Sequence, residues 1–240
     1  MNEGRSAVDQ AASGQVVALP ECVEIETGPE PGHAVVWLHG LGADGHDFEP
    51  IVPMLGTDRI GPVRFVFPHA PRRPVTVNGG MVMRAWYDIR ALDIARDQDR
   101  AGIEASADIT TALIEREIER GIPPDRIVLA GFSQGGAMAA YVGLRSPHKL
   151  AGLLILSAYL LDEEGIPGDP VNRETAAFVG HGRLDPVVPV MLGRYLSGAL
   201  KGLGMPVEYH EYDMPHSVAP EEIADISEWL ARVLTVNGER

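Results

Sequence analysis

Short runs of apolar, largely β-branched residues recur along the chain and are typical of buried strands. They cover residues 35–38, 63–67, 127–130, 153–157, 176–179 and 207–212. Residues 16–27 are expected to supply one or two further strands at a sheet edge. Apart from residues 207–212, which alternate in polarity, the runs are continuous and indicate strands covered on both faces, as in a parallel sheet.

Helical periodicity appears between several of these runs. In the clearest case one face is formed at steps of three to four residues by Ile103, Ala107, Thr110, Ile114 and Ile118. Further helices are predicted over residues 134–145, 190–201 and 220–234. This alternation of strand and helix predicts an α/β fold with a mostly parallel, doubly wound sheet and helices on both faces. Ligands of such sheets bind at the carboxyl ends of the strands.

One segment departs from the α/β rhythm. Residues 74–83 alternate in polarity around Asn78-Gly79, which predicts a β-hairpin just before Trp86. About eighteen residues separate the strands at 153–157 and 176–179, too few for a large lid. We find no repeat or linker, so we expect one domain over residues 31–240, preceded by an N-terminal segment, 1–30, of unknown role that supplies at most an edge strand.

Composition narrows the classes of partner. The chain has 240 residues, 34 of them acidic and 20 basic, and its net charge of −14 disfavours nucleic acid and anionic membranes as partners. Its longest apolar stretch, residues 150–161, is too short for a membrane helix. The first fifteen positions include charged residues and lack the apolar segment of a secretory signal. We therefore expect a cytoplasmic protein. Cys22 is the single cysteine and is interpreted as a buried hydrophobe or an inert thiol.

The sequence Gly131-Phe132-Ser133-Gln134-Gly135 matches G-x-S-x-G between a predicted strand and a predicted helix. In that context the serine lies on a strained turn that exposes its hydroxyl, and glycines flank it because a Cβ would collide with the neighbouring element. We therefore expect Ser133 to be a nucleophile, with the Gln134 N–H as an oxyanion donor. The alternative is a glycine-rich turn without a chemical role.

A serine nucleophile needs a base and a carboxylate, which in this fold follow in the order Ser, Asp or Glu, His. Of the four histidines after Ser133, which are His148, His181, His210 and His216, the last is preferred because it lies in the loop between the strand at 207–212 and the next helix. Asp185, in a proline-bounded turn after the strand at 176–179, is the preferred carboxylate, and Asp162 is the runner-up. The alternatives are a solvated loop histidine and an ordinary Asp-Pro turn.

A second oxyanion donor is expected in the loop after the strand at 35–38, where the Leu41 N–H is our candidate. His39 precedes Ser133 in the chain, so we expect it to have a structural role. Asp44, His46 and Asp47 follow no metal-ligand spacing, and no metal site is predicted.

Five blocks in this order resemble the carboxylesterase/acyl-protein thioesterase family of α/β-hydrolases, from about residue 35 to the C-terminus. They are residues 38–42, 86–88, 131–136, 181–189 and 215–216. The resemblance implies a catalytic triad of Ser133, Asp185 and His216, an oxyanion hole at Leu41 and Gln134, and an apolar acyl site at Leu41, Trp86 and Val187. Many relatives have glycine before the catalytic histidine, whereas this chain has Pro215, whose fixed φ is expected to affect the loop.

We thus expect a serine hydrolase that cleaves small-molecule esters, with thioesters as a further class, through an acyl-enzyme and without a cofactor. Short to medium acyl chains are expected because only the hairpin and Trp86 would cover the site. The alternatives are a dienelactone-hydrolase-like or peptidase-like enzyme of the same fold, and a catalytically silent binding module. The sequence leaves open whether the protein forms a homodimer.

Overall fold

The computed structural model describes residues 17–91 and 97–236. Its centre is a seven-stranded sheet with the strand order β1-β3-β2-β6-β7-β8-β9. The strands are β1 (Cys22–Glu26), β2 (His33–Leu38), β3 (Val63–Pro68), β6 (Ile127–Phe132), β7 (Gly152–Leu156), β8 (Ala176–Gly182) and β9 (Val207–Tyr212). β1 pairs antiparallel with β3, and the other neighbours are parallel. The predicted, mostly parallel sheet is confirmed.

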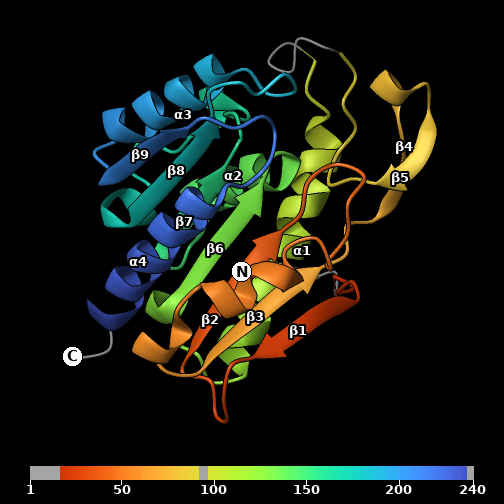
Figure 1. The fold of residues 1–240 in the computed structure, drawn as a ribbon. Helices are drawn as coiled ribbons and strands as arrows, with labels where there is room; N and C mark the ends of the chain where they lie inside the picture. The colour runs from red at the N-terminus through yellow and green to blue at the C-terminus, as the bar shows by residue number, and fades with distance from the viewer. Residues whose placement is uncertain (1–16, 92–96, 237–240) are drawn as a thin grey trace, which may run out of the picture.

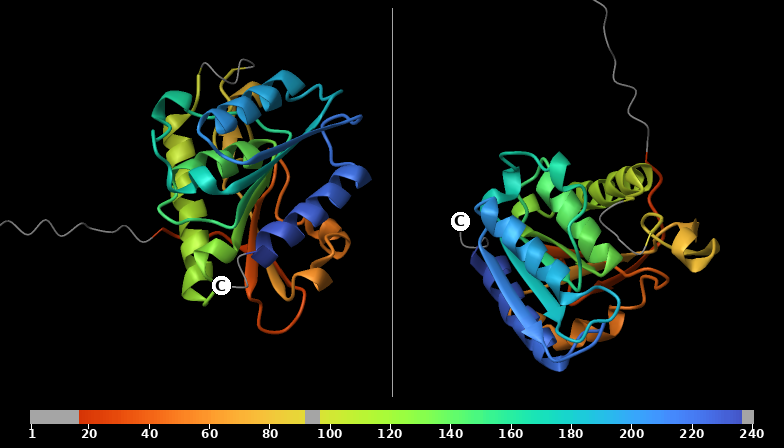
Figure 2. Two further views of the ribbon diagram at one scale, coloured as in Figure 1. Left: turned by 90° about the vertical axis from the view of Figure 1, so that its left-hand side faces the viewer. Right: turned by 90° about the horizontal axis from the view of Figure 1, so that it is seen from above.

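Helices cover both faces of this sheet (Figures 1 and 2). The helices α1 (Arg100–Glu119), α2 (Gln134–Arg145) and α3 (Val190–Gly202) pack on one face, and α4 (Pro220–Val236) packs on the other together with the 3-10 helix η1 (Glu49–Met54). Along β2, Ala34, Val36 and Leu38 contact the first layer, whereas Val35 and Trp37 contact the second. The continuous apolar strands of the sequence therefore arise because both faces are buried.

Short elements fill the connections. The predicted hairpin is present as β4 (Arg72–Val75) and β5 (Met81–Arg84), which pair antiparallel. Its turn holds η3 (Thr76–Asn78) followed by Gly79 and Gly80, both with positive φ. The segment between β7 and β8 carries only the single-turn helices η5 (Glu163–Gly165) and η6 (Val171–Glu174), and the remaining ones are η2 (Thr57–Arg59) and η4 (Pro124–Arg126).

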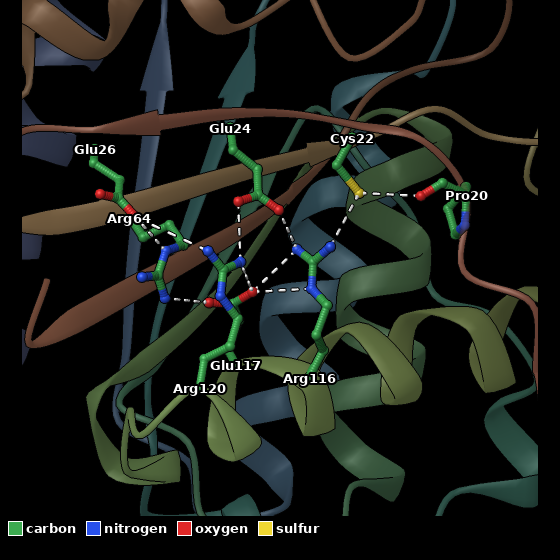
Figure 3. A network of polar contacts seen from close by, with 8 residues as sticks. All are labelled: Pro20, Cys22, Glu24, Glu26, Arg64, Arg116, Glu117 and Arg120. Atoms are coloured by element: carbon green, nitrogen blue, oxygen red, sulfur yellow. Dashed lines mark hydrogen bonds and ion pairs between the residues drawn. The ribbon is translucent and has the colours of Figure 1, made fainter.

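Ion pairs fasten the edge strand β1 to α1 (Figure 3). Glu117 on α1 is fully buried and accepts hydrogen bonds from Arg64 on β3, from Arg116 on its own helix and from Arg120 just after the helix ends. The same arginines reach across to Glu24 and Glu26 of β1. An exposed strand at a sheet edge can pair with another chain and aggregate. We interpret these ion pairs as structural, because they hold the edge strand β1 in place.

The expected edge strand in residues 16–27 is thus β1, whereas residues 1–16 lie outside the described part of the chain. The boundary at residue 30 between an N-terminal segment and a single domain stays a prediction. Among the described residues, no helix combines the length and apolarity that crossing a bilayer requires.

Candidate active site

Ser133 lies on the sharp turn between β6 and α2. Its backbone has φ 56° and ψ −120°, a conformation that is strained for a residue with a side chain. A Cβ on Gly131 would overlap the Gly135 carbonyl, and a Cβ on Gly135 would overlap the Leu38 carbonyl of β2. The two glycines of the motif are therefore required by the close approach of strand and helix, as the sequence indicated.

His216 joins Ser133 to Asp185 although the three residues are far apart in the chain. Its Nε2 lies 2.9 Å from the Ser133 Oγ, and its Nδ1 lies 2.6 Å from the Asp185 Oδ2. A carboxylate only accepts hydrogen bonds, so the Nδ1 carries the proton and the Nε2 accepts from the serine hydroxyl. All three side chains predicted from chain order therefore meet at the carboxyl edge of the sheet.

Asp185 is held rigidly in the turn between β8 and α3. Its carboxylate is fully buried, and the Oδ1 accepts the backbone N–H groups of Val187 and Val188 at 2.8 Å each. These two donors leave the Oδ2 directed to His216. Val187, which the resemblance assigns to the acyl site, has its side chain 59% exposed beside this turn.

The loop that carries His216 rests on β8. A Cβ at Gly182 would overlap the carbonyls of Met214 and Pro215, so this strand position must lack a side chain. The Ser217 N–H donates to the Pro215 carbonyl at 2.9 Å. With Pro215 in this position His216 still reaches both of its partners.

The loop after β2 lies against the serine. A Cβ at Gly40 would stand 3.4 Å from the Cβ of Ser133, so the residue before Leu41 packs against the serine. Within the described residues, the Leu41 N–H has no backbone acceptor. The Gln134 N–H begins α2, and the first amides of a helix have no acceptor inside it. Neither amide therefore has a backbone acceptor in the described part of the chain, and both stay candidates for oxyanion donors.

His39 fixes this loop, in agreement with the structural role expected for it. Its Nδ1 lies 2.7 Å from the Gly40 carbonyl and its Nε2 accepts the Ala70 N–H at 3.0 Å. Burial lowers the pKa of His39 to about 4, so that the ring is neutral near pH 7. A neutral ring donates from one nitrogen and accepts at the other, which matches both contacts.

Trp86 has a different place from the one that the resemblance implies. Its side chain is fully buried and offers no accessible surface to a substrate. The indole N–H instead donates to the His39 carbonyl at 2.9 Å. Its ring therefore supports the loop after β2 through this hydrogen bond. The expected contact of Trp86 with an acyl chain is corrected: the side chain is buried under the loop and holds it in place.

The side chain of Gln134 was missed by sequence reasoning, which considered only its backbone. The Oε1 accepts the Trp86 N–H and the Nε2 donates to the Tyr87 carbonyl, each at 2.8 Å. Both bonds are buried and span almost fifty residues of sequence. A polar residue inside a buried helix start was the available signal, because such a group needs internal partners.

The runner-up residues lie elsewhere. Asp162 forms ion pairs with Arg145 at 2.9 Å and Arg100 at 3.2 Å. The His210 ring stacks on Phe178 and its Nδ1 lies 3.7 Å from the Asp225 carboxylate. The structure gives neither of them a contact with Ser133.

A cavity of about 530 Å³ opens at the same edge of the sheet. The loop after β7 and the first turns of α3 line it with Tyr159, Leu160, Leu192 and Tyr195, and Arg100 and Asp162 are among its polar residues. Because β7 lies between β6 and β8, this loop lies between the strand ends that precede Ser133 and Asp185. The volume is in the range of small-molecule sites.

Comparison with known proteins agrees with this geometry. The model of the phospholipase/carboxylesterase family matches residues 20–234. The acyl-protein thioesterase 1 of Neurospora crassa is 43% identical over 211 residues, which cover 83% of this chain and 86% of that protein. The crystal structure of Arabidopsis thaliana SOBER1 has a TM-score of 0.79 at 30% identity and covers 84% of this chain and 99% of its own. Zea mays acyl-protein thioesterase 2 has a TM-score of 0.73 at 27% identity, covering 90% and 99%.

The family model spans most of the chain, and a curated relative exceeds 40% identity over four-fifths of it. The chain therefore belongs to the phospholipase/carboxylesterase family of α/β-hydrolases and is an esterase or thioesterase.

Proposed function

We propose that Ser133, His216 and Asp185 form the catalytic triad of a serine hydrolase that cleaves carboxylic esters and thioesters. The observation that carries the proposal is the unbroken pair of hydrogen bonds from Asp185 through His216 to Ser133. No metal or organic cofactor enters the proposed reaction, because a serine activated in this way supplies the nucleophile itself.

In the proposed reaction the Ser133 Oγ attacks the carbonyl carbon while His216 takes the hydroxyl proton on its Nε2. The resulting oxyanion is held by the N–H groups of Leu41 and Gln134. The protonated His216 then donates its proton to the departing alkoxide or thiolate, which leaves an acyl-serine. Water attacks this ester with His216 as the base, and the acid and the free serine are released. Asp185 keeps the imidazole in the required tautomer and stabilises its charged form.

Small ester and thioester substrates with short to medium acyl chains suit this site. The cavity of about 530 Å³ at the carboxyl edge of the sheet offers apolar surface from Leu160 and Leu192, and Val187, two residues after Asp185, is exposed. The curated relative from Neurospora crassa is named an acyl-protein thioesterase, which favours thioesters among the substrates. The excess of acidic side chains disfavours a nucleic acid partner.

A matched substrate series tests the proposed specificity. Oxyesters and thioesters that share one acyl group, from acetyl to palmitoyl, are assayed below their solubility limits together with the corresponding amides. We expect kcat/KM to be highest for short and medium chains, with both ester types cleaved and the amides resistant. Amide hydrolysis faster than ester hydrolysis would identify a peptidase instead, and a rate that rises only on lipid emulsions would contradict a site open to dissolved substrates.

Covalent labelling separates an enzyme from a silent binding module of the same fold. A fluorophosphonate reacts with a serine only when a base activates it. We expect one equivalent of label, located on Ser133 by peptide mass analysis, and none after heat denaturation. Protein that is folded and yet unlabelled would contradict an activated serine.

A further inference from the structure

A second histidine lies beside the proposed triad and has no part in it. His181 is in β8 and its side chain is fully buried. Its Nε2 lies 2.8 Å from the Val188 carbonyl and 3.7 Å from the Asp185 Oδ2. Its Nδ1 is buried and has no hydrogen-bond partner in the described part of the chain.

These contacts fix the tautomer of His181. A carbonyl oxygen only accepts, so the proton is on the Nε2 and the Nδ1 is bare. The Nδ1 faces Gly193 of α3. A Cβ at residue 193 would overlap this nitrogen, so position 193 supplies no side chain that could accept a hydrogen bond from it. A second proton on the Nδ1 would be buried without an acceptor. Burial accordingly lowers the pKa of His181 and keeps the ring neutral.

Val188 connects this ring to the carboxylate. Its carbonyl accepts from His181, and its N–H donates to the Asp185 Oδ1 at 2.8 Å. Two adjacent peptide groups of one turn are therefore held from opposite sides, by the imidazole and by the carboxylate. Without the imidazole the Val188 carbonyl would be buried and unpaired, which favours a different path of the turn.

We infer that His181 is a positioning residue, whose neutral Nε2–H holds the turn of residues 185–188 so that Asp185 points at His216. The inference rests on the proposed role of Asp185 and His216 in catalysis. His181 contacts neither Ser133 nor a substrate in this role and acts only through Asp185.

The charges around His181 explain why a neutral group is required. Asp185 faces it from the turn, His216 from the loop before α4, and Glu211 from the opposite position of β9. On α3, Arg194 already binds Glu211 at 2.6 Å. A charged ring at position 181 would repel the positive charge that His216 gains during the reaction. A neutral N–H donor holds the turn without this repulsion.

Two amide substitutions separate positioning from mere packing. The amide nitrogen of glutamine can take the place of the imidazole Nε2, whereas that of asparagine takes the place of the Nδ1 and cannot reach the Val188 carbonyl. His181→Gln therefore keeps the donor, and His181→Asn loses it with a side chain of the same polarity. Thermal unfolding of both variants shows whether they fold.

The readouts are the steady-state kinetics of ester hydrolysis and the low-field proton resonance of the His216 Nδ1–H. We expect His181→Gln to keep kcat within about threefold and to retain the resonance. His181→Asn should lower kcat by about 10²-fold with a smaller change in KM, as expected for a misplaced catalytic group, and move the resonance upfield. Equal kcat and equal spectra for the two variants would overturn the inference.

Nitrogen-15 NMR spectra of the His181 ring test the inference in the wild-type protein, without any substitution. They should show His181 as the neutral Nε2–H tautomer at pH 7, and a ring that is charged at this pH or carries its proton on the Nδ1 would also overturn the inference. The proposed triad is judged separately, by whether the wild-type enzyme shows the His216 resonance and loses activity without Ser133.

Discussion

The indole N–H of Trp86 donates to the carbonyl of His39 at 2.9 Å. This bond links the segment after the β4–β5 hairpin to the loop after β2, which packs against Ser133 at Gly40 and carries the proposed oxyanion donor Leu41. The loop is also held by its own histidine ring, through the Ala70 N–H. The loop of the proposed oxyanion donor is thus held by residues that are themselves buried.

Trp86→Phe should lower both stability and activity, because it leaves the buried His39 carbonyl without its donor. We expect a loss of about 1–3 kcal/mol in the free energy of unfolding beyond the effect of the smaller ring, and a lower kcat. Trp37→Phe is the matched control, since Trp37 is equally buried and its indole nitrogen has no partner among the described residues. Urea unfolding and ester kinetics of the two variants measure the difference, and indistinguishable variants would refute the role of the bond.

A methyl group on Gly135 should disrupt the turn around Ser133. Its Cβ would overlap the Leu38 and His39 carbonyls of the neighbouring strand and loop, so we expect Gly135→Ala to lose about 1–3 kcal/mol or more of stability and most of its activity. Gly198→Ala in α3 is the control, because a Cβ there meets nothing within 4 Å. It should stabilise the helix by about 0.5–1 kcal/mol and leave kcat unchanged. A Gly135→Ala enzyme with normal kcat would show that the close approach is dispensable.

Glu222 should make the protein less stable as the pH rises. The side chain is fully buried in the first turn of α4, and neither carboxyl oxygen has a hydrogen-bond partner in the described structure. Burial raises its pKa from 4.5 to about 8. Between these two pH values the folded chain keeps a proton that the unfolded chain releases, so stability falls as the pH rises through this range.

Glu222→Gln removes this dependence, because an amide does not ionise. With about 1.4 kcal/mol for each pKa unit, the variant should exceed the wild type by roughly 2–4 kcal/mol in the free energy of unfolding at pH 8, and by much less at pH 4.5. Glu221→Gln, at the exposed neighbouring position, is the control and should change little. Denaturant unfolding from pH 4.5 to 8 measures both, and a gain that does not grow with pH would refute the buried acid.

Much of the fold follows from local sequence pattern. The apolar runs and helical repeats predicted six strands of the central sheet and four helices, because each element buries a face of the right period. The meeting of Ser133, Asp185 and His216 followed from chain order, since they come after β6, β8 and β9, whose carboxyl ends lie at one edge of the parallel sheet.

The support of the site could not be predicted in the same way. The side-chain bonds of Gln134 and Trp86 and the contact of His181 with Val188 join segments whose distance depends on the complete packing. Family resemblance placed Trp86 at the site but could not say that its ring lies beneath the loop. Position along the chain predicts which residues gather at an edge, whereas the direction of a side chain depends on its tertiary contacts.

The most direct test of the account is the turnover of a chromogenic short-chain ester by the Ser133→Ala enzyme. Ser197→Ala, a buried serine of α3 outside the site, is the control and should keep the wild-type kcat. We predict that Ser133→Ala folds normally and loses about 10⁴- to 10⁶-fold in kcat. A folded Ser133→Ala protein that cleaves the ester at a rate near that of the wild type would contradict the proposed nucleophile and the mechanism built on it.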